Sequence, residues 1–254
     1  MSTALFENIV FGPVSSRRLG VSLGVNLLPQ HGKLCNFNCI YCECGWNEER
    51  RGDNVLPSFE QVALALESRL EEFSSEGKPL DTITFSGNGE PTLHPDFPRI
   101  IEKTIELRDR YFPASKVSVL SNATRVWKKE VREALMKVDN PILKLDSPDI
   151  EVVQAVNRPQ GEYSIETVIE GMEAFKGDFI LQTIFFQGSG HDMTDDGRVR
   201  RWYDIVRRVK PREIMMYTID RDTPQKGLSK VSVEEMQRIA APLEDEGFTV
   251  QIRG

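Results

Sequence analysis

Residues 22–46 read SLGVNLLPQHGKLCNFNCIYCECGW, and this stretch sets the fold that we expect. Its first part, SLGVNLLP (22–29), is rich in Leu and Val and is bounded by Gly20 and Pro29, which is typical of a short buried strand. The part that follows holds every cysteine of the chain: Cys35, Cys39, Cys42 and Cys44. The stretch therefore predicts a strand that runs directly into a cysteine-rich loop.

The same alternation of a strand and a connecting segment continues along the chain. Further strands are predicted at residues 81–87, 116–122, 141–146, 178–186 and 213–220. Helices are predicted at 59–73, with Ser58 and Gln61 as a capping box, and at 97–112, 126–138, 164–177 with Ser164 as N-cap, 197–210 and 232–247. Six strands separated by helices predict an α/β fold, a partial (β/α)6 TIM barrel, with a flat doubly wound sheet as the second choice. In both folds, chemistry belongs at the carboxyl ends of the strands.

Composition places the chain among soluble proteins and gives no reason to divide it. We expect a single domain over residues 1–254, with an N-terminal arm at 1–20 and a cysteine loop at 30–54. The charge of −7 and the pI near 5.2 disfavour general attraction to nucleic acid or to anionic membranes. The chain shows neither a signal-peptide pattern nor a run of 18 apolar residues, so we expect a cytoplasmic protein. In that reducing compartment clustered thiols favour metal binding or catalysis over disulfides.

The cysteine spacing indicates a metal centre. Cys35, Cys39 and Cys42 lie within eight residues, and iron–sulfur cubanes use tightly spaced thiolates of this kind, normally four. Three ligands would leave one iron open, as catalytic zinc sites keep one position free. The alternative is a structural zinc site with Cys44 or His31 as the fourth ligand, but a second ligand pair elsewhere in the sequence is missing.

Two motifs together carry a family resemblance. CNFNCIYC (35–42) resembles the Cys-x3-Cys-x-aromatic-Cys signature of radical SAM enzymes, and GNGEPT (87–92) resembles the Gly-Gly-Glu-Pro motif that they carry after the second strand. Between Gly12 and Gly190 the chain is also similar to the small Fe–S oxidoreductase proteins grouped with wyosine-type tRNA-modifying enzymes. Asn88 stands where the motif has its first glycine, which leaves the backbone path credible and the donor set open.

The resemblance implies a reaction and its cofactors. Cys35, Cys39 and Cys42 would hold one oxygen-sensitive [4Fe–4S] cluster, and S-adenosylmethionine (SAM) would chelate the fourth iron. One electron, from a low-potential donor such as flavodoxin or ferredoxin, would cleave SAM to a 5′-deoxyadenosyl radical, which abstracts hydrogen from an unidentified substrate. The cofactor performs this chemistry, while the protein positions the reactants and excludes water.

The resemblance also suggests residues that bind SAM. The turn at Asn88–Gly89–Glu90 would accept the methionine ammonium, and Tyr41 would lie beside the adenine. Lys144 and Asp146 share one face of a strand, so one could meet the methionine carboxylate and the other a ribose hydroxyl. For each residue the alternative is structural: a tight turn, aromatic packing, a salt bridge or a buried polar contact. The full expected set is Tyr41, Asn88, Gly89, Glu90, Ser121, Asn122, Lys144, Asp146, Gln182 and Tyr217.

Several functions stay open at this point. Besides a single-cluster radical SAM enzyme, the chain could be an activase of a glycyl-radical enzyme, a tRNA-modifying enzyme or a metal-stabilised binding module. The tRNA interpretation is disfavoured because the chain is acidic and has no cysteines for a second cluster. Arg17, Arg18 and Arg158 match positions of the narrower family and would hold an anionic substrate or pair with acidic residues. For Cys44 we expect packing beside Trp46 rather than a place near the substrate.

Overall fold

The computed structural model describes residues 5–16, 20–49, 52 and 55–254, and in them eight strands form one sheet. The strands follow chain order across the sheet. They are β1 (Val10–Ser16), β2 (Gly20–Val25), β3 (Thr82–Phe85), β4 (Lys116–Ser121), β5 (Asn140–Lys144), β6 (Ile180–Ile184), β9 (Glu213–Tyr217) and β11 (Val250–Arg253). From β2 to β11 all neighbours are parallel, whereas β1 is antiparallel to β2. In the described residues β1 and β11 pair with no further strand of this sheet, so the barrel stays open.

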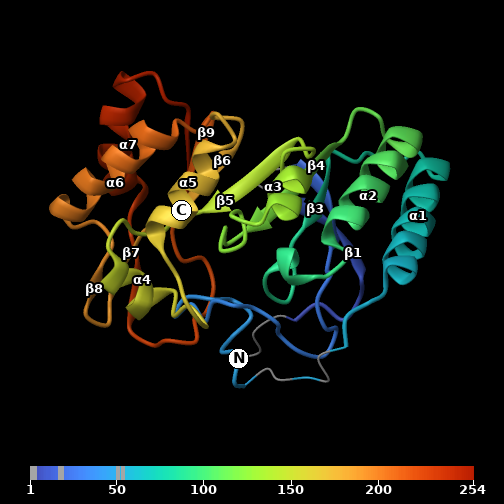
Figure 1. The fold of residues 1–254 in the computed structure, drawn as a ribbon, viewed down its shortest axis with the longest axis horizontal. Helices are drawn as coiled ribbons and strands as arrows, with labels where there is room; N and C mark the ends of the chain where they lie inside the picture. Colours follow the sequence, from blue (N-terminus) through green and yellow to red (C-terminus); the bar gives the residue numbers. More distant parts are fainter. Residues whose placement is uncertain (1–4, 17–19, 50–51, 53–54) are drawn as a thin grey trace.

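Helices follow the strands and cover the outer face of the sheet. They are α1 (Phe59–Ser75), α2 (Phe97–Tyr111), α3 (Lys129–Leu135), α4 (Ile150–Val156), α5 (Ile165–Glu173), α6 (Asp196–Val209) and α7 (Val233–Asp245), with a 3-10 turn η1 (Pro91–Leu93). Figure 1 shows α1 and α2 side by side at one end of the molecule. The predicted caps are confirmed: Ser58 and Gln61 form a capping box on α1, and the Ser164 side chain caps α5. Among the described residues, no helix is long and apolar enough to cross a membrane.

The alternation of side chains along each strand separates the core from the inner face. Ile83 and Phe85 point outward and are fully buried under the helices. Thr82 and Thr84 point inward, where Thr84 lines a cavity. The paired strands keep this register, so the core lies between the sheet and the helices while polar side chains collect inside.

The predicted set of strands is incomplete. The sheet gains β11 after the last helix and the antiparallel β1 within the expected N-terminal arm. Both are edge strands: β11 is half-buried throughout, and β1 contains Gly12 and Pro13, so neither shows a buried strand pattern. The predicted strand at 178–186 ends at Ile184, and Phe186 starts β7 (Phe186–Gly188), which pairs with β8 (His191–Asp192) and β10 (Leu228–Lys230) in a small second sheet.

Candidate functional site

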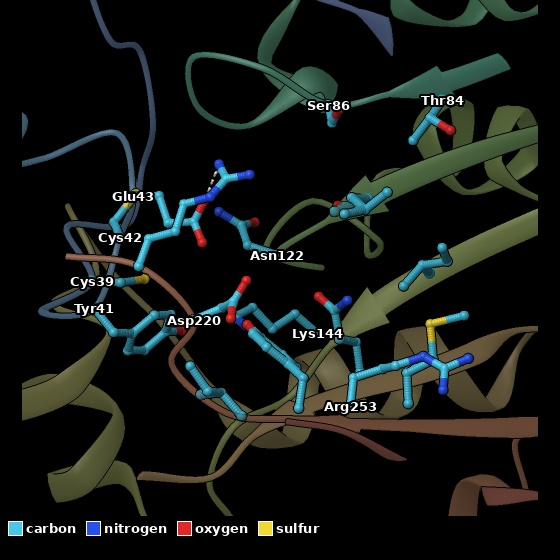
Figure 2. Close-up of a pocket in the computed structure, with 18 of the residues that line it drawn as sticks. Cys39, Tyr41, Cys42, Glu43, Thr84, Ser86, Asn122, Lys144, Asp220 and Arg253 are labelled. Carbon is cyan, nitrogen blue, oxygen red and sulfur yellow. Dashed lines mark hydrogen bonds and ion pairs between the residues drawn. The ribbon is translucent and has the colours of Figure 1, made fainter. Parts of the chain in front are cut away.

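A cavity of about 560 Å³ lies inside the open barrel, at the carboxyl ends of the strands. The cysteine loop, the loops after β3 and β4, the strands β5 and β6, and the segment after β9 contribute its walls. Figure 2 shows Cys39, Cys42 and Tyr41 at one side and Lys144 from β5 facing them. The expected residues that line the cavity are Cys35, Cys39, Tyr41, Cys42, Gly89, Glu90, Ser121, Asn122, Lys144, Gln182 and Tyr217. Asn88 and Asp146 are not part of the lining, but Asp146 contacts Tyr41 and Lys144, which are.

The cysteine loop is held by the segment that follows α4. The Ile40 and Asn38 backbone N–H groups donate to the Val156 and Asn157 carbonyls at 2.9 and 2.8 Å. The Gln160 N–H donates to the Asn36 carbonyl at 2.8 Å. Residues 156–160, which carry part of the narrower sequence resemblance, therefore have a structural role, because these bonds fix the backbone between the cysteines.

Cys44 takes a different position from the other three cysteines. Cys35, Cys39 and Cys42 line the cavity, whereas Cys44 is not part of its lining and places its Sγ 3.5 Å from the Gly87 carbonyl. Its thiol also hydrogen-bonds Cys42, and this bond and burial raise the pKa of Cys44. Cys44 thus joins the cysteine loop to the turn after β3.

Lys33 is a buried cation beside the thiols. Its side chain is 4 % exposed and donates to the Gly45 carbonyl at 2.6 Å and to Cys42. Burial would lower the pKa of Lys33, but charge on Cys42, Cys35 and Cys39 raises it above its usual value. A hydrogen bond from Cys44, aided by Lys33, lowers the pKa of Cys42 to about 6. A buried ammonium of this kind is stable only beside negative charge.

The donor set fits an iron–sulfur cluster. Each of the three thiols that line the cavity has a polar donor at its sulfur: Asn122 at Cys35, Asn157 at Cys39 and Lys33 at Cys42. Such donors suit anionic thiolate ligands and not neutral thiols. Within the described part of the chain no three His, Cys, Asp or Glu side chains are arranged to hold a single metal ion.

Burial raises the pKa of Cys39 to about 11, and burial also raises the pKa of Cys35, with Cys39 adding to the effect. A cluster on these residues would therefore form with release of protons.

Gly89 allows the turn after β3 to touch the cysteine loop. The Leu34 N–H donates to the Asn88 carbonyl at 2.9 Å, and the Glu90 N–H donates to the Leu34 carbonyl at 3.1 Å. Gly89 has φ +136°, and a Cβ there would lie 1.9 Å from the Leu34 oxygen. The motif glycine is therefore required by a backbone contact.

Asn88 is fully buried, and its side chain holds other segments in place. Its amide exchanges hydrogen bonds with the Phe6 backbone at 2.8 and 2.9 Å and donates to the Pro29 carbonyl at 2.8 Å. Asn88 accordingly joins the described start of the chain to the turn. Because its side chain is occupied by these bonds, only its backbone is left to contact a ligand.

Glu90 is the hydrogen-bonding centre of the wall between β3 and β4. The residue is 2 % exposed, and its carboxylate accepts bonds from the Thr92 N–H and hydroxyl, the Ser121 hydroxyl and the Asn122 N–H at 2.6–3.1 Å. Burial raises the pKa of Glu90, while these four bonds oppose the rise. Asn122 in turn donates to Asn36 in the cysteine loop at 2.8 Å. Glu90 thus orients Ser121 and Asn122, two further residues that the sequence predicts in the site.

Lys144 and Asp146 form a buried ion pair, 3.2 Å apart. The Asp146 carboxylate also accepts the Tyr41 hydroxyl, and Lys144 donates to the Tyr217 hydroxyl. Burial would lower the pKa of Lys144, but Asp146 and then Tyr217 raise it above its usual value. The ammonium lies 5.1 and 4.8 Å from the ring centres of Tyr41 and Tyr217. Lys144 is therefore a fixed positive charge at the cavity wall.

The remaining candidates are placed as follows. Gln182 lies on β6 and lines the cavity. Arg158 lies 4.7 Å from the centre of the Trp46 ring, outside the cavity lining. Arg17 and Arg18 lie outside the described residues. Sequence reasoning missed Lys33, Asn157 and the segment 218–221, of which Arg221 pairs with Glu43 at 2.9 Å. A buried lysine and a buried asparagine beside the cysteines show no pattern in the sequence that could reveal their contacts.

Residues 30–196 match the model of the radical SAM superfamily, more than half of the chain. The chain belongs to the radical SAM superfamily. It is 31% identical to the UPF0026 protein slr1464 of Synechocystis sp. over 85% of this chain and 77% of that protein. It is also 29% identical to a "GTPase Obg" of Brachyspira hyodysenteriae over 90% of this chain, but spans only 32% of that protein's length.

Solved structures of radical SAM proteins share the fold. A radical SAM methyltransferase from Sphaerobacter thermophilus matches with a TM-score of 0.66 and 13% identity, over 91% of this chain and 65% of that one. Streptococcus suis SuiB bound to S-adenosylmethionine matches with a TM-score of 0.60 and 15% identity, over 91% of this chain and 45% of that one. Together with the parallel sheet, these matches confirm the partial TIM barrel.

Proposed function

We propose that the protein is an enzyme that holds one [4Fe–4S] cluster on Cys35, Cys39 and Cys42 and uses it to cleave SAM. The observation that carries the proposal is that these three thiols, each with a polar donor at its sulfur, line the same cavity as the Gly89–Glu90 turn. When bound, the cluster supplies the electron that splits the sulfonium C–S bond of SAM and yields a 5′-deoxyadenosyl radical, which abstracts hydrogen from a substrate.

The chain's own residues would bind SAM at opposite walls of the cavity. The buried Glu90 carboxylate and nearby backbone carbonyls present negative charge to the methionine ammonium. Lys144 presents a positive charge from β5 to the methionine carboxylate or to another anionic group. Tyr41 and Gln182 line the space between for the nucleoside. The barrel walls enclose part of this space and would limit the access of water to it.

We place this enzyme in the cytoplasm, with a low-potential flavodoxin or ferredoxin as electron donor and a substrate still to be identified. The glycyl-radical activase and the tRNA-modifying enzyme differ from this proposal only in the substrate. Because the chain covers a minor part of several proteins that it resembles, their substrates do not transfer to it.

Anaerobic reconstitution with iron and sulfide tests the proposal. We expect a brown protein whose absorbance is bleached by dithionite and which then forms 5′-deoxyadenosine and methionine from SAM. A protein that binds zinc stoichiometrically, takes up no cluster and leaves SAM intact would instead support the structural metal site.

A further inference from the structure

The three thiols that line the cavity receive side-chain donors from three separate parts of the chain. Asn122, after β4, places its Nδ2 3.8 Å from the Cys35 Sγ. Asn157, after α4, places its Nδ2 3.5 Å from the Cys39 Sγ. The Lys33 ammonium hydrogen-bonds Cys42. Each ligand sulfur thus has a donor of its own, in addition to the Phe37 backbone N–H, which lies 3.4 Å from Cys35.

Asn157 is the most completely fixed of these donors. Its side chain is 2 % exposed, and its Nδ2 also lies 2.6 Å from the Asp146 carboxylate and 2.8 Å from the Tyr41 hydroxyl. Its backbone N–H donates to Val153, and its carbonyl accepts from Asn38, both at 2.8 Å. The side chain therefore cannot turn away without breaking contacts on two elements.

The chemistry of its neighbours sets the orientation of the Asn157 amide. The Asp146 carboxylate can only accept hydrogen bonds, and so can Cys39 when it is a thiolate ligand, so the NH₂ group must face both. The amide joins the ligand sulfur to the carboxylate that is paired with Lys144. Asn157 therefore fixes the position of the cysteine loop relative to the cavity wall formed by β5.

Donors at thiolate sulfurs affect electron transfer. Reduction adds a negative charge to a cluster and its thiolates, and hydrogen bonds to the sulfurs stabilise that charge. The effect is strong in a buried site because the local dielectric constant is low. A cluster with such donors is easier to reduce than one without them.

We propose that Asn157 is a positioning residue that, together with Asn122 and Lys33, raises the reduction potential of the cluster and fixes Cys39 against the Lys144–Asp146 pair. This inference rests on the proposed function, because it requires a cluster on Cys35, Cys39 and Cys42. Asn157 acts through Cys39.

The test is a redox titration of the reconstituted Asn157→Leu variant without SAM. The EPR signal of the reduced cluster reports the midpoint potential. Leucine keeps the approximate shape of asparagine and removes the donor. We expect the ratio of reduced to oxidised cluster at a fixed potential to fall about tenfold, which equals a shift of about 59 mV for one electron. A midpoint equal to that of the parent protein overturns the inference.

Asn140→Leu is the matched control. Asn140 starts β5, at the opposite end of the strand from Lys144, and binds Ser118 and Arg212. This substitution removes a half-buried amide far from the cysteines, so the midpoint should stay at the parent value. An equal shift in both variants would show a general loss of structure and overturn the specific role.

A second variant tests the inference in case Asn157→Leu does not assemble a cluster. Lys33→Met removes the donor at Cys42 from a different segment and should lower the midpoint in the same direction. If Lys33→Met keeps the parent midpoint, the inference is wrong. A parent protein that takes up no cluster would contradict the proposed function itself, which distinguishes the two failures.

Discussion

At the scale of single residues, Glu90 shows how one motif position serves both structure and binding. Its carboxylate accepts four hydrogen bonds that join η1 to the end of β4, and it lines the cavity. A carboxylate buried this deeply is stable because charge-assisted bonds replace water. Its role in the fold and its proposed role toward SAM therefore cannot be separated by removing it alone.

We predict that Glu90→Ala takes up iron like the parent protein but binds SAM about tenfold more weakly. It should also unfold with about 2–3 kcal/mol less free energy, because buried donors lose their acceptor. Equilibrium dialysis with SAM and urea denaturation measure the two effects. Thr92→Val is the matched control, since it removes one bond to Glu90 and no proposed SAM contact. An Ala variant that binds SAM as tightly as the parent contradicts the assignment.

The residues of the site could be predicted from the sequence where they belong to a motif. The cysteines, Gly89 and Glu90 occur in a recognisable order and lie together in the structure. Lys33 and Asn157 were not predictable, because their partners are separated from them by other segments and depend on the completed fold. The roles of the expected SAM residues stay predictions.

At the scale of elements, the contact between the turn after β3 and the cysteine loop places the strictest limit on residue size. Residues 34 and 89 form a parallel bridge with no room for a side chain at Gly89. Local signals on the helices were predictable, because the caps of α1 and α5 involve residues three apart. Edge strands β1 and β11 were not, since pairing with the sheet and not their own pattern defines them.

We expect Gly89→Ala to lower the free energy of unfolding by about 3 kcal/mol, because it combines a strained φ with a clash against the Leu34 oxygen. Gly77→Ala provides the control: Gly77 has φ +64° and open space around a Cβ, so only the strain of about 1 kcal/mol remains. Denaturant unfolding of both variants measures the difference. Equal effects would mean that the backbone contact adds nothing.

At the scale of the whole molecule, the parallel order brings distant segments to one cavity. The alternation of strands and helices was enough to predict this arrangement, since parallel strands place their carboxyl ends at one edge. How far the sheet closes, and which groups meet across the cavity, depend on packing that no single segment encodes.

The stability of the whole fold should depend on pH through Asp139. Partial burial would raise the pKa of this carboxyl, but the Val117 N–H and Arg108, at 2.8 and 2.7 Å, lower it overall. Because the pKa of Asp139 is lower in the folded than in the unfolded protein, its ionised carboxylate stabilises the fold above about pH 3.9. This stabilisation is lost as the pH falls through the pKa of the folded protein.

Asp139→Asn should therefore lower the free energy of unfolding by about 1 kcal/mol at pH 7, a value typical of a partly exposed ion pair. The difference from the parent protein should shrink as the pH falls below about 3.9 and through the lowered pKa of the folded carboxyl. Urea unfolding of both proteins from pH 7 into this acidic range measures the difference. A difference that grows as the pH falls would contradict the sign derived from the Arg108 contact.

In the proposed enzyme three cysteines, and not four, hold the centre that cleaves SAM. The decisive experiment is parallel anaerobic reconstitution of Cys44→Ala and Cys42→Ala, with assays of iron, sulfide and 5′-deoxyadenosine. Because Cys44 lies outside the cavity lining against the Gly87 carbonyl, its variant should keep nearly the parent iron and sulfide content and still form 5′-deoxyadenosine. Cys42→Ala should form none. A Cys44 variant without a cluster, beside a Cys42 variant that still cleaves SAM, would show that the ligand assignment is wrong.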